Sequence, residues 1–164
     1  MNKSDPIDTA WKIHAAITDW TGKVDNKASF ALAIESALLT AVITLSGQDR
    51  ALAGLSGWGL AWYILGVLLL AVSAFCAICV VRPRLRGQHL SDEAPANFIY
   101  FGHLRQLTSD EVEKHLTDTN LLPVLAKQLV EMSKIAWIKH RWVQWSLTLA
   151  PVGVVFLAIS ATYG

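Results

Sequence analysis

Charged residues are scarce in this sequence. Asp, Glu, Lys and Arg make up 16% of its 164 residues, and the formal net charge is only +1. No stripe of basic residues alternates with aromatic residues, as binding to a nucleic-acid polymer requires. The sequence therefore gives no sign of a nucleic-acid partner. With 53% hydrophobic residues it is also too apolar to be disordered.

Cysteine is nearly absent as well. The two cysteines, Cys76 and Cys79, have C-x-x-C spacing, which places them one turn apart on a helix. A redox or metal-binding role needs exposure and further ligands, and the surrounding residues are apolar. We interpret both as small packing residues.

The motifs of common enzyme chemistry are missing too. No nucleotide-binding glycine motif and no H-E-x-x-H zinc motif occurs. Five histidines are scattered without an acidic partner at ligand spacing: His14, His89, His103, His115 and His140. No Ser, His and acid set suggests a nucleophile. We therefore expect no cofactor, no metal site and no enzyme activity. The first 27 residues carry charges throughout, so we expect no cleavable signal peptide.

Long uncharged runs are what the sequence does contain. Residues 58–81 form a run of 24 residues without one charge. A helix needs about 20 apolar residues to cross a bilayer, and a helix of a water-soluble protein has no reason to be apolar on every face. Arg82, Arg84 and Arg86 follow at once, which is typical of the cytoplasmic end of a span. This run predicts a membrane-spanning helix.

Two further runs predict a first span over residues 28–46 and a third over residues 142–163. Pro151 lies within the third, and we expect it to kink that helix, which a packed bundle tolerates. Glu35 lies within the first, where an acidic side chain costs roughly 2.5 kcal/mol or more at the bilayer centre. Either Glu35 is buried, partnered or protonated and sets the packing of the helices, or it belongs to a polar ring or ion path of an oligomer. Small residues that permit close helix contact share this first span: Ala31, Ser36, Ala37, Thr40, Ala41 and Thr44.

The remaining segments are polar and helical. Asp5 and Pro6 suit the start of a helix, and Ile13, Ile17 and Trp20 begin an apolar stripe along it. Thr108 with Glu111 predicts a capping box and a short helix to about Leu116. Asn120 then caps a longer helix that runs into the third span. It carries an apolar stripe of Leu122, Leu125, Leu129, Met132 and Ala136.

The distribution of basic residues predicts the orientation. Of the 14 Lys and Arg, only Arg50 lies in the loop between the first two spans. Cytoplasmic loops are enriched in Lys and Arg, so this loop and the C-terminus face the periplasm and the N-terminus faces the cytoplasm of a bacterial inner-membrane protein. The fold class is an all-α membrane protein with three transmembrane helices, an amphipathic N-terminal helix and a small helical cytoplasmic layer. One domain is expected, with these parts: 1–27, amphipathic helix; 28–46, first span; 47–57, outer loop; 58–81, second span; 82–141, cytoplasmic helical segment; 142–163, third span.

Three short motifs occur in a familiar order. Residues 24–29 read VDNKAS and lead into the first span, and residues 97–102 read NFIYFG. Gln128 and Leu129, residues 133–135 and Lys139 then precede the last span. This order resembles the transmembrane Pycsar effector family over nearly the whole chain, from about Trp11 to Tyr163. The resemblance implies antiviral defence, in which a cyclic pyrimidine nucleotide made on phage infection triggers impairment of the inner membrane by a homo-oligomer.

A cyclic nucleotide needs a cation for its phosphate and a stacking surface for its base. The candidate residues are Lys23, Lys27, Lys134 and Lys139 for the phosphate, with Phe98, Tyr100 and Phe101 for the base. Alternatively, Lys23 and Lys27 anchor the chain near the bilayer surface and the aromatic residues pack between helices.

Two functions remain open on the sequence. The first is a ligand-gated oligomer that breaches the bilayer. The second is a membrane scaffold that recruits a cytoplasmic partner through the stripe from Leu122 to Ala136 and the aromatic segment. A small transporter subunit would need more polar residues across its spans than Glu35 supplies.

Overall fold

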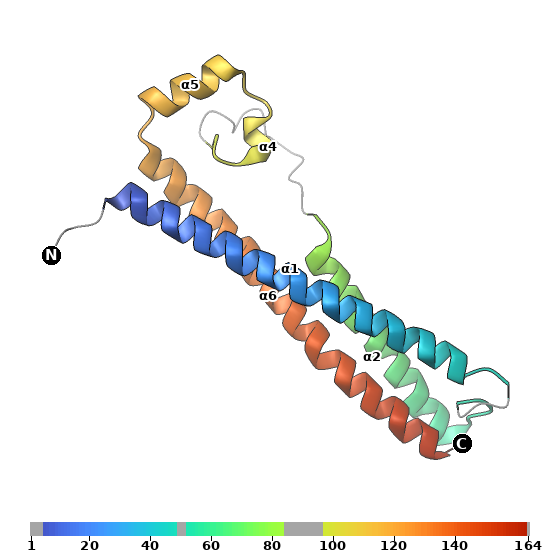
Figure 1. Cartoon of the computed structure of the whole chain (residues 1–164). Coiled ribbons are helices and arrows are strands. Elements are labelled where there is room, and N and C mark those ends of the chain that lie inside the picture. Colours follow the sequence, from blue (N-terminus) through green and yellow to red (C-terminus); the bar gives the residue numbers. More distant parts are fainter. Residues whose placement is uncertain (1–4, 49–51, 84–96, 164) are drawn as a thin grey trace. The chain divides into compact units, whose positions relative to one another are not determined.

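The computed structural model describes residues 5–48, 52–83 and 97–163, and over these the chain forms helices and no strand. Three of the helices are long and apolar enough to cross a membrane, which confirms the prediction of an all-α membrane protein. Arg50, Arg84, Arg86, His89 and Pro95 lie outside the described residues. The α-helices are labelled in Figure 1: α1 Pro6–Leu45, α2 Gly57–Val81, α4 Phe101–Leu104, α5 Ser109–Asp118 and α6 Leu121–Ser160. The 3-10 helix η2, Ala161–Tyr163, follows α6.

Helix α1 joins the amphipathic segment and the first span into one helix of 40 residues. It begins as predicted, since the Ile7 amide donates to the Asp5 carboxylate over 2.9 Å. The helix runs through Gly22 without interruption. A glycine inside a helix costs only about 1 kcal/mol, which the hydrogen bonds of the flanking turns outweigh. The two predicted segments are therefore parts of one continuous helix, and only the residue composition changes from amphipathic to apolar at their boundary.

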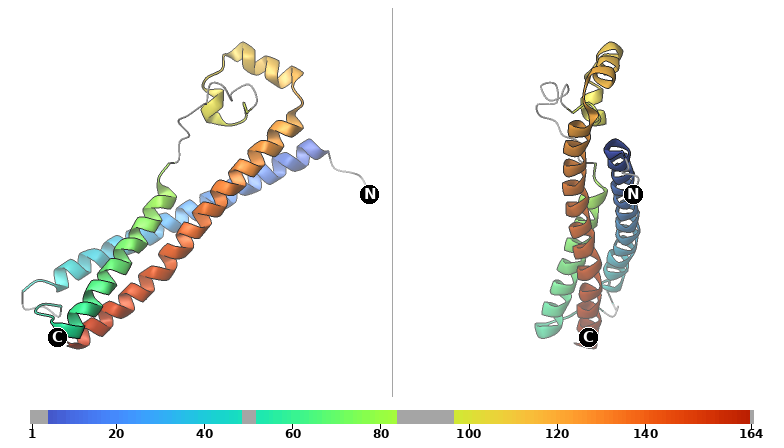
Figure 2. Two further views of the ribbon diagram at one scale, coloured as in Figure 1. Left: turned by 180° about the vertical axis from the view of Figure 1, so that it is seen from behind. Right: turned by 90° about the vertical axis from the view of Figure 1, so that its left-hand side faces the viewer.

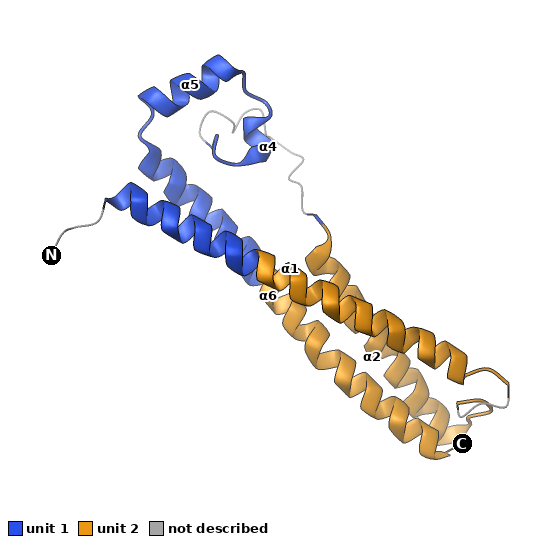
Figure 3. Cartoon of the chain, in the orientation of Figure 1, with its two compact units in different colours: residues 1–21, 83–137 blue, residues 22–82, 138–164 orange. Residues whose placement is uncertain are grey.

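The described chain divides into two compact units, shown in different colours in Figure 3. Unit 1 comprises residues 1–21 and 83–137, and unit 2 comprises residues 22–82 and 138–164. Helices α1 and α6 each contribute to both units, because both helices are continuous across the boundary. The two units are described separately below.

Unit 2 is a bundle of three helices, in which α2 runs opposite to α1 and α6 (Figure 3). Two apolar clusters hold it together. Val24, Ala28, Val80 and Val143 form the first cluster, with Trp142 packed against it. The second cluster lies towards the other end of the helices and consists of Val42, Leu52, Leu70 and Leu157.

Glycines bring α2 and α6 into close contact in unit 2. A side chain added at Gly66 would place its Cβ 2.9 Å from the backbone oxygen of Gly153 and 2.7 Å from Leu157 Cγ. At Gly153 the added Cβ would lie 3.0 Å from the backbone oxygen of Gly66. Small residues allow this approach, which gives the van der Waals packing that holds helices together in lipid.

Unit 1 contains α4 and α5 together with residues 6–21 of α1 and 121–137 of α6, which lie side by side in both figures (Figures 1 and 2). Only part of each predicted apolar stripe is covered, since Ile13 and Trp20 of α1 are 46% and 56% exposed and Leu122 of α6 is 37% exposed. Ile17 of α1 is 6% exposed, and Leu125 of α6 is fully buried. The Leu122 amide donates to the Asn120 side chain over 3.1 Å, so the predicted cap at the start of α6 is confirmed.

The capping box at α5 is confirmed as well, since the Thr108 side chain accepts from the Glu111 amide and the Glu111 carboxylate accepts from the Thr108 amide. The backbone and hydroxyl hydrogen bonds from Thr108 lower the pKa of Glu111. A lowered pKa means that Glu111 stabilises α5 above its ordinary pKa, and that this contribution is lost as the pH falls through the folded-state value.

We expect the amides of the first turn of α5 to exchange faster with deuterium as the solution is acidified. The Thr108→Ala variant should exchange faster than wild type already at neutral pH, because an N-cap replacement costs about 1 kcal/mol. It should keep part of the acid dependence, since residue 108 still offers its backbone amide to Glu111. Equal protection of wild type and variant at neutral pH would contradict this role.

Candidate functional site

The polar centre of unit 2 is a group of three side chains, one from each helix. Glu35 of α1 is 1% exposed, and Ser73 of α2 and Ser146 of α6 are fully buried. Along every helix this group lies between the two apolar clusters. The sequence placed Glu35 within a span, but it gave no sign that these two serines would be its partners.

Three hydrogen bonds connect the group. The Ser146 hydroxyl donates to Glu35 Oε1 over 2.8 Å, and the Ser73 hydroxyl is hydrogen-bonded to the same carboxyl oxygen. Ser73 Oγ also lies 2.8 Å from the backbone oxygen of Ser146. The other carboxyl oxygen, Glu35 Oε2, is buried and has no hydrogen-bond partner among the described residues. Glu35 is thus a partnered side chain inside its own bundle, as the first of the two sequence alternatives requires.

An ion pair joins α1 and α6 near the middle of each helix, within unit 2. Lys139 Nζ donates to both carboxylate oxygens of Asp25, over 2.6 and 2.8 Å. The Lys139 side chain is 12% exposed and that of Asp25 is 37% exposed. The pair connects two of the motifs that carry the family resemblance, VDNKAS and the segment ending at Lys139. The two residues are 114 positions apart, and no periodicity in the sequence relates them.

The other candidate lysines are on the surface. Lys23 and Lys27 are exposed on α1, two residues to either side of Asp25. Lys134 belongs to unit 1, where it forms an exposed ion pair with Glu131 over 2.8 Å. Lys139 already has a carboxylate partner, so a phosphate that bound this lysine would compete with Asp25.

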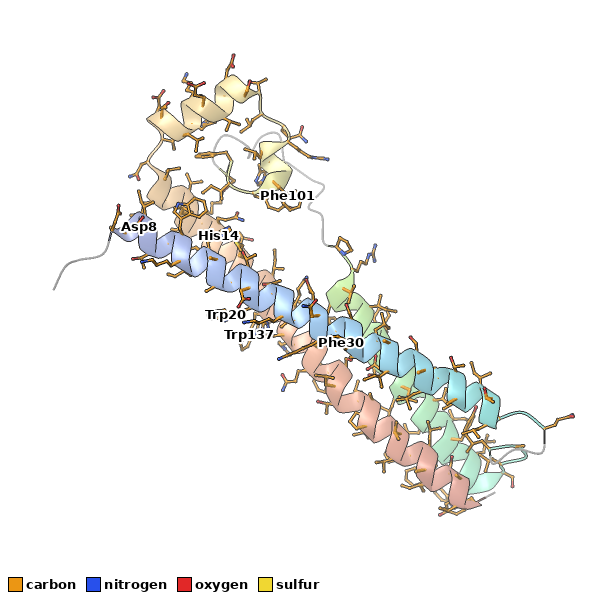
Figure 4. The ribbon with its side chains drawn as sticks, in the orientation of Figure 1. Asp8, His14, Trp20, Phe30, Phe101 and Trp137 are labelled. Atoms are coloured by element: carbon orange, nitrogen blue, oxygen red, sulfur yellow. The ribbon has the colours of Figure 1, made fainter. Side chains whose placement is uncertain are left out.

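The three candidate aromatic residues, all in unit 1, differ in how accessible they are. Phe98 is 2% exposed and stacks on His115 with ring centroids 5.2 Å apart. Tyr100 packs against Phe101 and against His103, whose Nδ1 lies 3.1 Å from the backbone oxygen of Asn97. Phe101 is 63% exposed and is labelled in Figure 4. Of the three rings, Phe101 alone presents a large free surface to a base.

A shallow, open pocket in unit 1 lies along α5. Its lining is mainly apolar and includes Leu104, Leu107, Val112 and Leu116. The one charged residue in the lining is Glu113. A hollow with a carboxylate and no Lys or Arg does not suit a phosphate. Among residues 5–48, 52–83 and 97–163, no three His, Cys, Asp or Glu side chains come together as a metal site.

The small residues of α1 point mostly away from its own bundle. Of the six small residues noted in the first span, Ala31 is buried and the other five are exposed. Four of these five, together with Ala33, form one exposed face, which we call the small-residue face: Ala33, Ala37, Thr40, Ala41 and Thr44. The Thr40 and Thr44 hydroxyls donate to the backbone oxygens four residues earlier, so their protons are already used within the helix. Phe30, labelled in Figure 4, is 74% exposed at the start of this face.

A comparison with protein families gives one match, to the family described as Pycsar effector protein domain, over residues 9–164. No curated protein and no solved structure matches the chain. The matched range contains all three candidate spans except for the first residues of α1, and it includes both ends of the Asp25–Lys139 pair.

Proposed function

Because the chain belongs to the Pycsar effector family and is thereby an antiphage-defence membrane effector, we propose that it responds to a cyclic pyrimidine nucleotide and then impairs the inner membrane. The family match over residues 9–164 is the observation that carries this proposal. The orientation we propose has the N-terminus in the cytoplasm, where the nucleotide is made, and the C-terminus in the periplasm. The chain acts by binding and rearrangement, without an enzymatic step.

Membrane impairment requires more than one copy of the chain, since three helices cannot enclose a wide pore. The small-residue face of α1 supports self-association. Small residues are favoured where helices meet in lipid, yet these five are exposed on the chain's own bundle. We propose that this face contacts a second copy in the oligomer.

The contacts proposed for the nucleotide follow from accessibility. Lys23 and Lys27 are exposed beside Asp25 and offer cations for a phosphate. A phosphate bound there also attracts the Lys139 ammonium, which weakens the ion pair between α1 and α6. Unit 1, considered by itself, also offers candidate contacts: Phe101 has an exposed ring for base stacking and Lys134 is an exposed cation, whereas Phe98 would first have to leave His115. Tyr100 packs against Phe101 and stays a candidate in the same unit.

A scaffold function receives less support. The stripe that would recruit a partner includes Leu125, which is fully buried, and Ala136, which is 9% exposed. Leu122 and Phe101 stay exposed at 37% and 63%, but the buried part of the stripe is not free to bind another protein.

The test is expression in bacteria loaded with a membrane-potential dye, with and without a co-expressed pyrimidine cyclase. We expect depolarisation only when both the chain and the cyclic nucleotide are present. Purine cyclic nucleotides serve as the specificity control. No depolarisation with any nucleotide would contradict the proposal.

The same assay tests the small-residue face. Ala37→Leu should reduce depolarisation at least several-fold and shift the purified chain to a smaller size in detergent, because the larger side chain keeps the copies apart. Ala71→Leu makes the same change at an exposed position of α2 and is the matched control. Equal loss in both variants would show that added bulk anywhere on the spans is harmful, and that this face has no special part in assembly.

A further inference from the structure

Glu35 is the one acidic or basic side chain in the three spans predicted from the sequence, and among the described residues no ion pair is formed with it. The polar groups hydrogen-bonded within its site are the Ser73 and Ser146 hydroxyls and the Ser146 backbone oxygen. The nearest charged residue on its own helix is Lys27, about two turns away. Arg82 and Arg141, the nearest on α2 and α6, are exposed beyond the ends of the spans.

The number of hydrogen bonds in this group can be compared with the number of hydroxyl protons that could form them. Three contacts connect Glu35, Ser73 and Ser146, and the two hydroxyl groups supply two protons. The Ser146 backbone oxygen can only accept, so the Ser73 proton is used there. The contact between Ser73 and Glu35 then needs a proton on the carboxyl group.

The cost of burying an ionised carboxylate also favours a protonated Glu35. An ionised carboxylate here would have one oxygen with hydroxyl partners and a second, Oε2, buried without a partner. A buried charge without a cation or a full set of donors is strongly unfavourable, and in lipid no water replaces them. A neutral acid leaves only a carbonyl oxygen unpaired, which costs much less.

We propose that Glu35, held by Ser73 and Ser146, is an intramembrane proton-binding site whose carboxyl group carries a proton in the assembled three-helix bundle. Release of the proton leaves a carboxylate that the bundle cannot satisfy, and the helices separate or admit water. The ligand of the site is the proton, and one side chain from each span is needed to bind it. This inference does not depend on the nucleotide response proposed above.

Infrared spectroscopy tests the protonation state directly. The full chain is reconstituted in phosphatidylcholine nanodiscs at about pH 7.5, where exposed carboxyl groups are ionised. We expect the carbonyl stretch of a neutral carboxylic acid in wild type and its absence in Glu35→Gln, whose amide resembles the neutral acid in shape and hydrogen bonding. The same spectrum from both proteins in this region would overturn the proposal.

Two serine variants make the assignment specific. Ser73→Ala removes a hydrogen-bond partner of the carboxyl group and should shift the band without abolishing it. Ser36→Ala removes a hydroxyl on the same helix that donates to its own backbone at Leu32, and should leave the band unchanged. Should Glu35→Gln fail to fold, a band that moves in Ser73→Ala but not in Ser36→Ala still identifies Glu35, and a band that moves in neither overturns the proposal.

Discussion

Gly66→Val should destabilise the transmembrane bundle more than other single changes to its helix faces. The added Cβ would lie 2.9 Å from the Gly153 backbone oxygen, and a backbone atom cannot move aside as a flexible side chain can. Helices α2 and α6 must therefore separate, and the contacts of Leu157 in the second apolar cluster are lost with them. Overpacking of this kind costs roughly 1–3 kcal/mol, and its measure is the free energy of unfolding of the reconstituted chain in dodecyl sulfate.

Gly22→Val is the matched control for this prediction. Gly22 also lies inside a helix, but a Cβ added there meets nothing within 4 Å. The control should change the free energy of unfolding by less than about 1 kcal/mol, since only helix propensity differs. If the two valine variants are equally stable, the close approach of α2 and α6 is not what holds the bundle.

Lys139→Asp should be the second large effect, and it should be reversible by a second change. The substitution places two carboxylates together where Lys139 Nζ now contacts both oxygens of Asp25. Lys139 is 12% exposed and Asp25 is 37% exposed, so solvent screens the pair only partly. We expect a loss of about 2 kcal/mol, between the values for exposed and buried pairs. The double variant Asp25→Lys with Lys139→Asp should recover most of it.

Lys134→Asp provides the comparison. It makes the same substitution in an ion pair whose lysine is 63% exposed, beside Glu131 on the same helix. Exposed pairs at this spacing contribute only about 0.2–0.5 kcal/mol, so the loss should be small. If the charge-swapped double variant is no more stable than Lys139→Asp alone, the Asp25–Lys139 contact does not hold α1 to α6.

Local features were predictable from the sequence. The uncharged run 58–81 became α2, Gly57–Val81, because an apolar helix in lipid keeps all its backbone hydrogen bonds within itself. The starts of α1, α5 and α6 followed from Asp5, Thr108 and Asn120, since capping depends on a side chain and amides two or three residues away. Pro151 lies within α6, and its kink stays a prediction.

The candidate site was predictable only in part. Sequence reasoning singled out Glu35 and Lys139, but not Ser73, Ser146 or the pairing of Lys139 with Asp25. The binding role of the four candidate lysines stays a prediction. A serine inside an apolar run carries no signal of its own, because serines occur in membrane helices at many positions that bind no partner. The sequence indicated that the small residues of α1 permit close helix contact but not on which side, and five of the six noted are exposed.

By itself, the sequence determined that the chain is helical, that it crosses a membrane three times and which residues cap its helices, because each of these depends on neighbours within a few positions. The tertiary structure decided which face of each span turns inwards, and hence that Glu35 meets Ser73 and Ser146 while Ala37 and Thr40 stay outside. The physical reason is that lipid and a helix bundle are about equally apolar. Hydropathy therefore cannot distinguish the two sides of a span, and only close packing and the partners of a few polar atoms can.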